Sequence, residues 1–316
     1  MAGGEKVPIN PLTAVRATTG AVVRLARHVH IDPLAVERVA RELADHRRRP
    51  AGWDDVHHFR DGGPLTVQYL LVLDTLNFCF WPAPEWDYQR LALALKRATD
   101  QDPGWLDADR LSRLTGAELT GRLGGALPLL DERVRLLREA GAVLDERWGG
   151  QAAALVEAAH GSAAALVALV AAEFPGFRDH AIYEGKQIFF YKRAQIFVGD
   201  LWGSFAGELW GSFDDIGDLT MFADYRVPQL LRERRVLRYG PRLAAAVDTG
   251  RLIPAGSDFE VELRAATVQA VELLREHLEG RGHPLTSLTL DWLLWQEGEA
   301  RQRELKPHHR TLTIFY

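Results

Sequence analysis

The sequence has only one cysteine in 316 residues, Cys79. A single thiol can form neither an internal disulfide nor a four-thiolate zinc site, so a reducing, cytoplasmic setting is expected. The first six residues lack the apolar core of a secretory signal, and the longest apolar stretch, Ala163–Ala172, is about half as long as a membrane span requires. We therefore expect neither secretion nor insertion into a membrane.

Positive charge is not in excess either, since 38 lysine and arginine residues face 43 aspartate and glutamate residues and the formal net charge is −5. This sign is wrong for a protein that tracks a phosphate backbone, so no stable nucleic-acid partner is expected. Hydrophobic residues make up 47% and charged residues 26% of the chain, which are ordinary values for a folded globular protein. Composition thereby excludes intrinsic disorder and fibrous architectures.

Several motifs that carry well-known chemistry are missing. The sequence has no Gly-x-Gly-x-x-Gly fingerprint, no Walker-type phosphate loop and no Gly-x-Ser-x-Gly elbow, so Rossmann, nucleotide-triphosphatase and α/β-hydrolase interpretations lose their usual support. It also has no His-Glu-x-x-His helix. The adjacent histidines, His57 with His58 and His308 with His309, point in different directions and make poor joint ligands. We expect no metal and no cofactor.

Helical patterns dominate what is present. Asp32 followed by Pro33 is typical of a helix N-terminus, and apolar residues then recur at the spacing of a buried helix face, at Val36, Val39, Ala40 and Leu43. Similar stripes cross residues 130–144, 263–274 and 285–295. Short strands are expected only near residues 181–190 and 311–316, because the sequence has no series of alternating segments and no Asn-Gly or Asp-Gly turn between apolar runs. The predicted fold is mainly α with a few short strands.

The predicted domain organisation is simple. Residues 1–12 contain glycine and proline with little periodicity and are expected to form a flexible N-terminal arm. No internal repeat or linker divides the remainder, so residues 13–316 are expected to form a single domain. The sequence does not decide whether this domain has one lobe or two.

The densest cluster of polar residues among aromatic ones is Ile188–Asp200. If this segment is helical, Lys192, Ile196 and Asp200 share one face because they are spaced four residues apart. That face presents an ammonium and a carboxylate two turns apart. From the periodicity alone, the favoured interpretation is a core helix with one solvated charged edge.

A second candidate is the acid in Leu219–Leu230. Asp224 stands between apolar Phe222 and aromatic Tyr225, where burial would raise its pKa unless a cation or hydrogen bonds oppose that effect. On spacing alone, a helix cap or a surface pair with Arg226 is the favoured interpretation. A positioned carboxylate is also what cleavage of a glycosidic bond requires, since its transition state carries positive charge on the anomeric carbon.

Two further segments carry candidate binding groups. Asp74–Pro82 places Phe78 and Trp81 near the amide of Asn77, which suits stacking on a flat base with an edge hydrogen bond. Aromatics in such a run are more often plain core. Lys306–Thr311 gathers several donors and is interpreted as an anion site or, alternatively, as a solvated tail.

Taken together, these segments resemble the queuosine salvage proteins, the queuosine 5′-phosphate N-glycosylase/hydrolases. Six stretches in the family's order carry the resemblance: Thr75–Trp81 (TLNFCFW), Phe190–Ile196 (FYKRAQI), Asp200 with Trp202, Thr220–Gln229 (TMFADYRVPQ), Glu260–Arg264 (EVELR) and Pro307–Thr311 (PHHRT). They extend over most of the chain. Gly203–Gly211 departs from the family's pattern, so the loop in front of the site is expected to differ.

The resemblance implies a fold like that of the helical DNA glycosylases and the hydrolysis of queuosine 5′-monophosphate to queuine and ribose 5-phosphate. Queuine can then be reinserted into tRNA by a separate transglycosylase. The catalytic pair that it implies is Asp224 with Lys192. Asp224 would stabilise the oxocarbenium-like carbon and activate a water, with covalent attack as the less favoured alternative. Lys192 would hold the phosphate or keep Asp224 ionised.

The same resemblance assigns substrate-binding residues. For the base, Phe78 and Trp81 are candidates to sandwich the ring, Asn77 to contact its edge, and Asp200 to accept hydrogen bonds from its amino and imino groups or from the cyclopentenediol. These roles lie on two separate segments of the chain. A 7-deazapurine cannot take a proton on the missing nitrogen, so the leaving base needs other donors.

For the rest of the nucleotide, Tyr225 and Arg226 adjoin the catalytic carboxylate and are assigned to substrate binding. The phosphate is expected to be held by Lys192 together with His308, His309 and Arg310, because an acidic protein must draw a dianion into a local positive site. Protonation of the two imidazoles would tighten that binding towards lower pH.

Two functions of other classes stay open on the sequence alone. One is a non-catalytic carrier of queuine or its nucleotide, and the other is a glycosylase that acts on polynucleotides. The net charge of −5 argues against the second, because a duplex or tRNA normally meets a basic surface. The expected partner is a small-molecule substrate.

Overall fold

Residues 10–316, the part of the chain that the computed structural model describes, contain fourteen α-helices and four short strands, which confirms a mainly α fold. The α-helices are α1 (Pro11–Leu25), α2 (Pro33–Asp45), α3 (Pro64–Leu76), α4 (Tyr88–Gln101), α5 (Ala108–Ser112), α6 (Gly116–Leu123), α7 (Leu130–Trp148), α8 (Ala152–Glu157), α9 (Ala163–Glu173), α10 (Lys192–Ser204), α11 (Arg226–Glu233), α12 (Pro241–Asp248), α13 (Asp258–Glu279) and α14 (Ser287–Ala300). The strands are β1 (Val29–Ile31), β2 (His180–Tyr183), β3 (Lys186–Phe189) and β4 (Leu237–Tyr239).

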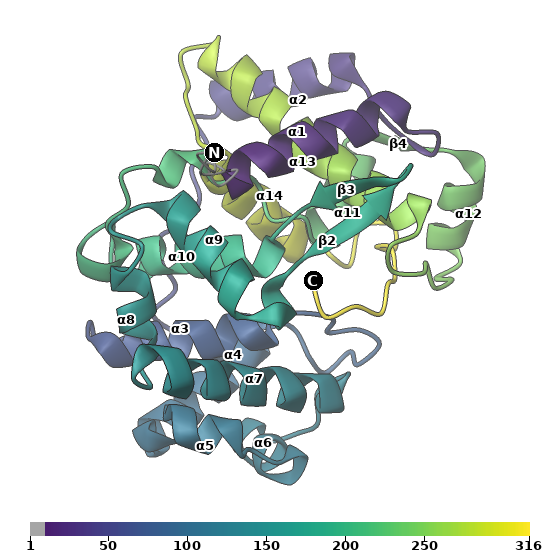
Figure 1. The fold of residues 1–316 in the computed structure, drawn as a ribbon. Helices are drawn as coiled ribbons and strands as arrows, with labels where there is room; N and C mark the ends of the chain where they lie inside the picture. Colours follow the sequence, from purple (N-terminus) through teal and green to yellow (C-terminus); the bar gives the residue numbers. More distant parts are fainter. Residues whose placement is uncertain (1–9) are drawn as a thin grey trace, which may run out of the picture.

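The helices gather around two large buried clusters. One consists mainly of apolar side chains from α3 to α10, and the other mainly of side chains from α1, α2, α11, α13 and α14. Figure 1 shows α1 and α2 at one end of the molecule and α5, α6 and α7 at the other, with α9, α10 and the β2–β3 hairpin between them. Tyr191, just before α10, packs against both clusters. The start of α10 therefore lies where the two halves meet.

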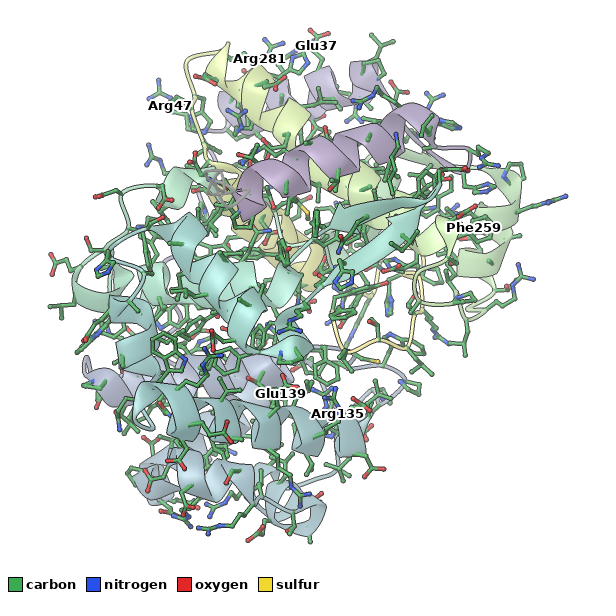
Figure 2. The ribbon with its side chains drawn as sticks, viewed as in Figure 1. Glu37, Arg47, Arg135, Glu139, Phe259 and Arg281 are labelled. Atoms are coloured by element: carbon green, nitrogen blue, oxygen red, sulfur yellow. The ribbon has the colours of Figure 1, made fainter. Side chains whose placement is uncertain are left out.

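The helix predicted after Asp32 is confirmed as α2. Asp32 accepts hydrogen bonds from the backbone N–H groups of Leu34 and Ala35, and the four predicted apolar positions of α2 are buried. The stripe over residues 263–274 is likewise buried in α13. The stripe over 285–295 is only partly confirmed, because Leu285 precedes α14 and Trp292 and Trp295 are half-buried. At the surface, the ion pair of Glu37 and Arg281 (3.2 Å) ties α2 to the turn after α13 (Figure 2).

The strands form two small antiparallel pairs, β1 with β4 and β2 with β3. The strand signal near residues 181–190 is thus confirmed. Its turn is Glu184-Gly185, whose φ angles of 47° and 72° fit the left-handed geometry that two-residue hairpins require. The strand expected over residues 311–316 is wrong: that segment is irregular, and the only pairing nearby among residues 10–316 is a single bridge between Leu252 and Arg310.

The N-terminal arm predicted over residues 1–12 is wrong for its last residues. Asn10 caps α1 by accepting from the N–H groups of Leu12 and Thr13, and Pro11 and Leu12 are buried in that helix. Residues 1–9 lie outside the described residues. No helix within residues 10–316 is long and apolar enough to cross a membrane. The single-domain organisation of residues 13–316 stays a prediction.

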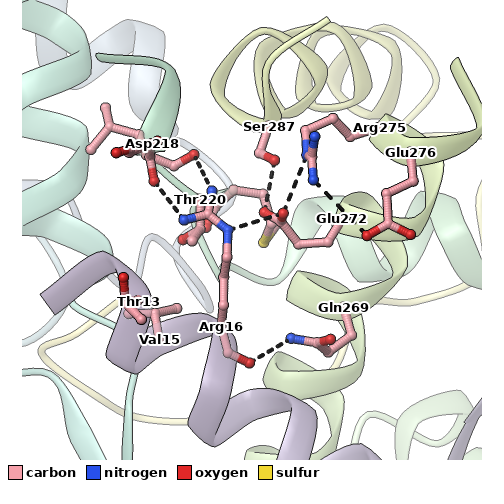
Figure 3. A network of polar contacts seen from close by, with 12 residues as sticks. Thr13, Val15, Arg16, Asp218, Thr220, Gln269, Glu272, Arg275, Glu276 and Ser287 are labelled. Atoms are coloured by element: carbon pink, nitrogen blue, oxygen red, sulfur yellow. Dashed lines mark hydrogen bonds and ion pairs between the residues drawn. The ribbon is translucent and has the colours of Figure 1, made fainter. Parts of the chain in front are cut away.

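A polar network joins α1, α13 and the segment that leads towards α11 (Figure 3). The guanidinium of Arg16 on α1 contacts Glu272 on α13 at 3.0 Å and donates to the carbonyl oxygens of Asp218 and Leu219 at 2.8 and 3.3 Å. Ser287 donates to the other oxygen of Glu272 at 2.7 Å. These bonds satisfy backbone oxygens of an irregular segment and so fix its course.

Candidate active site

The first functional side chain lies at the start of α10. Lys192 is the first residue of this helix, and its backbone N–H donates to Asp179 Oδ2 at 3.0 Å. The preceding Tyr191 has a φ of 51°, a conformation uncommon for a tyrosine, which turns the chain sharply into the helix. The ammonium of Lys192 is 5% exposed and donates to the carbonyl oxygen of Asn77 at 3.3 Å.

The predicted helix over Lys192 and Asp200 is confirmed, and its charged face is not solvated. Every residue from Lys192 to Leu201 is buried, including Ile196 and Asp200. A Cβ on Gly199 would stand 3.0 Å from side-chain atoms of both Leu288 and Phe222, so this glycine permits α10 to pack closely against both side chains. The interpretation as a helix with a wet charged edge is therefore wrong.

The second functional side chain lies on the irregular segment between α10 and α11. This segment is held by side chains from several helices. Gln195 on α10 exchanges hydrogen bonds with Thr220, accepting from its N–H at 2.8 Å and donating to its hydroxyl at 2.9 Å. Two residues further on, the N–H of Phe222 donates to Asp291 Oδ1 on α14 at 2.9 Å. Hydrogen bonds thus hold Thr220 and Phe222, the residues four and two positions before Asp224, in place.

Asp224 combines a structural contact with a free oxygen atom. Its Oδ1 accepts from the backbone N–H groups of Arg226 and Val227, both at 3.0 Å, and so caps the start of α11. The cap interpretation is confirmed, whereas the surface pair with Arg226 is wrong: that guanidinium is buried and contacts Glu299 at 2.6 Å. Because only Oδ1 serves the cap, Oδ2 is left for other chemistry.

Four buried carboxyl groups act electrostatically on the same lysine. They are Asp74 on α3, Asp200 on α10, Asp224 before α11 and Asp291 on α14. Burial lowers the pKa of Lys192 to about 8, and the negative charge of Asp224 is the strongest influence opposing that decrease. We call Lys192 and these four acids the Lys192 cluster. A lysine with this pKa is still mostly charged near neutral pH.

Burial raises the pKa of every acid in the Lys192 cluster, though not equally. The pKa of Asp74 and that of Asp291 stand well above the usual range, and the pKa of Asp200 is raised to about 7. For Asp224, Lys192 and the N–H of Val227 oppose the desolvation, and the pKa is raised less strongly. Neither carboxyl oxygen of Asp74 has a hydrogen-bond partner. The cluster therefore carries fewer negative charges than its composition allows.

A buried ion pair links the segments that carry Lys192 and Asp224. The guanidinium of Arg264 on α13 makes a bidentate contact with Asp179 at 2.9 and 2.6 Å, and both side chains are 2% exposed. Its Nε donates to the carbonyl oxygen of Ala223 at 3.0 Å. Since Asp179 also accepts from the N–H of Lys192, one ion pair fixes the backbone beside both Lys192 and Asp224.

The aromatic segment Asp74–Pro82 lies beside the Lys192 cluster, but its residues have two different environments. Phe78 is 1% exposed, and its ring lies 4.1 and 5.2 Å from the guanidinium carbons of Arg133 and Arg193. Both cations donate to carbonyl oxygens around the end of α3. Phe78 therefore belongs to the packed interior and is poorly placed to stack on a base. Asn77 and the half-buried Trp81 remain candidates, because Asn77 contacts Lys192 directly.

The predicted phosphate-binding residues differ in how far the structure exposes them to solvent. His309 is 2% exposed and contacts the hydroxyl of Tyr316 at 3.2 Å, while His308 packs against the ring of Tyr225 at 4.5 Å. Burial lowers the pKa of His308 to about 4 and that of His309 to about 3, so both imidazoles are neutral near pH 7. The expected gain of charge on mild acidification is thus wrong. Arg310 is exposed, with its guanidinium carbon 5.9 Å from the Trp81 ring.

Sequence reasoning missed several members of the site. Asp291 lies within an apolar helix, and a lone acid among leucines and tryptophans is the signal that could have marked it as buried. Asp74 lies in the segment Asp74–Pro82 and Arg264 in the motif Glu260–Arg264, but the sequence assigned neither of them a role. Asp179 had no signal at all, because only the fold brings it to Arg264. No group of three histidine, cysteine, aspartate or glutamate side chains in residues 10–316 could hold a metal ion. Metal independence stays a prediction.

Comparison with known proteins identifies the family. The model of the queuosine salvage protein family matches residues 57–316. Among curated relatives, the queuosine 5′-phosphate N-glycosylase/hydrolase of Dictyostelium discoideum is 47% identical over 98% of this chain and 100% of its own length. The proteins with that name from Sphaerobacter thermophilus and Bos taurus are 46% and 34% identical, each over 96% of this chain and over 97% and 99% of their own lengths. The chain therefore belongs to the queuosine salvage protein family.

Proposed function

We propose that this protein is an N-glycosyl hydrolase that cleaves queuosine 5′-phosphate and releases queuine for salvage. The observation that carries the proposal is the buried pair of Lys192 and Asp224, in which the lysine is the strongest influence keeping the carboxyl group ionised. The names of relatives that match nearly the whole chain agree with this chemistry. The other product is ribose 5-phosphate, since water adds at the anomeric carbon.

The geometry favours water activation by Asp224. Its Oδ1 is held by two backbone N–H groups, which orient the carboxylate and leave Oδ2 to accept a proton from water. The same negative charge stabilises the oxocarbenium-like carbon in the transition state. Covalent attack by Asp224 is the alternative, and it would leave a glycosyl ester that a second step hydrolyses.

Lys192 acts in two ways in this proposal. Its charge, which is largely retained near neutral pH, keeps Asp224 ionised in a buried environment. It also offers a cation to the substrate phosphate, together with the exposed guanidinium of Arg310. The half-buried ring of Trp81 lies 5.9 Å from the guanidinium carbon of Arg310, so this ring is the best candidate to cover the base.

The expected partner is a nucleotide-sized molecule, and neither a stable nucleic-acid partner nor a cofactor is part of the proposal. The net charge of −5 and the deep burial of the Lys192 cluster favour a small substrate over a polynucleotide. A cytoplasmic location, predicted from the single cysteine, likewise stays a prediction.

One turnover assay tests this function against its two alternatives. Purified protein is incubated with queuosine 5′-phosphate, with queuosine nucleoside and with queuosine-containing tRNA, and free queuine is measured by mass spectrometry. We expect release from the nucleotide, and Lys192→Met should abolish most of it while Lys96→Met, a change at a surface lysine on α4, should not. Tight binding without release would establish a carrier. Release from tRNA alone would establish a polynucleotide glycosylase.

A further inference from the structure

Six consecutive backbone carbonyl groups at the end of α3 are bound by buried cations. Each carbonyl oxygen from Asp74 to Cys79 accepts a hydrogen bond from the side chain of Lys192, Arg193 or Arg133. These oxygens lie at or just beyond the C-terminus of the helix, where no further helical N–H groups follow and the carbonyl dipoles concentrate negative potential. The segment therefore attracts a cation that can reach it.

Two of these cations are neighbours on α10 and bind the segment to different extents. The guanidinium of Arg193, the second residue of α10, donates to the carbonyl oxygens of Asp74 and Thr75 at 3.1 and 2.8 Å. The ammonium of Lys192 makes one hydrogen bond in the described part of the chain, at 3.3 Å. Because an ammonium has three hydrogens, two remain for Asp224 and the substrate.

Arg193 depends on carbonyl oxygens for the stabilisation of its charge. The side chain is buried, its Nε has no hydrogen-bond partner among the described residues, and its other hydrogen bonds there all go to carbonyl oxygens. Burial lowers the pKa of Arg193 to about 10, so the side chain is charged near neutral pH. The mechanism described above gives this buried charge no task.

Resting on the proposed function, we propose that Arg193 is a positioning residue for Lys192. By occupying the carbonyl oxygens of Asp74 and Thr75, it keeps the ammonium from binding there and leaves it directed at Asp224 and the substrate. Without Arg193, these two buried acceptors would lose their donor, and unpaired buried acceptors are costly. Lys192 already binds the same segment, so its ammonium would move towards α3 and away from Asp224.

The charged groups around Lys192 make this displacement measurable. They are Asp74 on α3, Arg193 and Asp200 on α10, Asp179 before β2, Asp224 before α11 and Asp291 on α14. Among these groups Arg193 is the one cation, and its charge lowers the pKa of Lys192. The main influences on the pKa of Asp224 other than burial are Lys192, the N–H of Val227, Arg226 and Glu299. A change at Asp224 that follows the loss of Arg193 is therefore expected to pass through Lys192.

Arg193→Met tests the proposal in the kinetics, because it removes the cation and its donors while keeping a long side chain. Wild-type kcat should rise with pH as Asp224 ionises and fall as Lys192 loses its proton. In the variant, kcat should be lower by about tenfold or more, and both limbs of the profile should move to higher pH. The acidic limb moves because Asp224 loses its cationic neighbour, and the alkaline limb because Lys192 loses a repelling charge and gains acceptors.

Arg178→Met is the matched control. The guanidinium of Arg178 likewise donates to carbonyl oxygens at the end of a helix, those of Ala171 and Ala172 on α9, but it lies outside the Lys192 cluster. We expect its kcat to stay within about twofold of wild type and both limbs to stay in place. If Arg193→Met does not fold, Arg193→Gln replaces it, because the amide keeps one donor group without the charge. Both limbs should then move in the same direction by a smaller amount.

Lysine titration by NMR tests the same displacement without any turnover. Lys192 is one of five lysine residues in the sequence, so in ¹³C-lysine-labelled protein its Cε signal is the one that vanishes in Lys192→Met. The pKa of Lys192 should be about 8 in wild type and higher by about half a pH unit or more in Arg193→Met. Asp224→Asn should lower that pKa in the wild-type background, and this decrease should shrink by about half or more when Arg193 is replaced.

These outcomes separate the positioning role from the proposed function. Failure to release queuine, together with a smaller effect of Asp224→Asn in the Arg193→Met background, would reject the proposed function and retain the positioning role. An undiminished effect of Asp224→Asn, a pKa of Lys192 that stays at its wild-type value in Arg193→Met, or an acidic limb that stays in place while queuine is released would each overturn the positioning role.

Discussion

Replacement of Asp224 by asparagine separates the chemical role of this side chain from its structural one. The amide oxygen of asparagine can still accept from the N–H groups of Arg226 and Val227, so the cap on α11 survives. The negative charge beside Lys192 is lost. We therefore expect the free energy of unfolding to change by no more than about 1 kcal/mol, since the cap is retained and a buried charge is removed.

The expected loss of activity is much larger than the loss of stability. Removing one group that stabilises transition-state charge costs about 10²–10³ in kcat, or about 2.7–4 kcal/mol. The charge of Asp224 also raises the pKa of Lys192, so the lysine pKa should fall below about 8 in the variant and any dependence on its proton should move to lower pH. Queuine release under single-turnover conditions and urea unfolding measure the two quantities separately.

The comparison with Asp224→Ala sharpens the test. Alanine removes the cap as well as the charge, so it should cost a further ~0.5–2 kcal/mol of stability while lowering kcat by a similar factor to asparagine. If Asp224→Asn turns over within about tenfold of wild type, Asp224 is not the transition-state stabiliser. If both variants lose activity only in proportion to folded protein, its role is structural.

Three further predictions concern the surroundings of this pair. Arg264→Gln leaves Asp179 buried without its cation and should cost about 3–5 kcal/mol in urea unfolding, whereas a loss below about 1 kcal/mol would show that the pair does not fix the site. The folded-state pKa values of His308 and His309 lie below those of the unfolded chain, so the unfolded state binds more protons as pH falls from about 6.5 to about 4, and the melting temperature should drop more steeply there than in a His309→Phe variant. Arg310→Ala should lower kcat/KM for the nucleotide by about tenfold or more relative to the nucleoside, and an equal effect on both would place the phosphate elsewhere.

Local patterns in the sequence were sufficient for features that a short segment determines by itself. The cap at Asp32 and the shared face of Lys192 and Asp200 depend on residues within one or two helical turns, so spacing predicts them. The same spacing could not tell a solvated face from a buried one. Burial of α10 results from its packing against α9 and against α3 and α14, which lie far away in the chain.

Convergence of distant residues could not be predicted. Asp74, Asp291 and Lys192 meet only after α3, α14 and α10 pack, and no motif links them. The hairpin turn was missed because Glu184 adopts the left-handed conformation that asparagine or aspartate more often takes. The histidine pair was expected to gain charge on mild acidification because nothing in a run of basic residues shows that its imidazoles are buried.

The division of roles among the four carboxyl groups follows from their environments. A single ammonium, that of Lys192, faces four acids, and full ionisation would leave three uncompensated negative charges in a buried site. Protons are therefore retained where the negative charge is least stabilised. Asp74 has no hydrogen-bond partner for either oxygen, and its pKa stands well above the usual range.

Asp224 is at the opposite extreme, because two backbone N–H groups and the lysine stabilise its charge, so it is the acid best able to serve as a base or electrostatic stabiliser near neutral pH. Asp200 lies between these limits, with a pKa raised to about 7. Which of the four acids keeps its proton is thus decided by environment although the side chains are chemically identical.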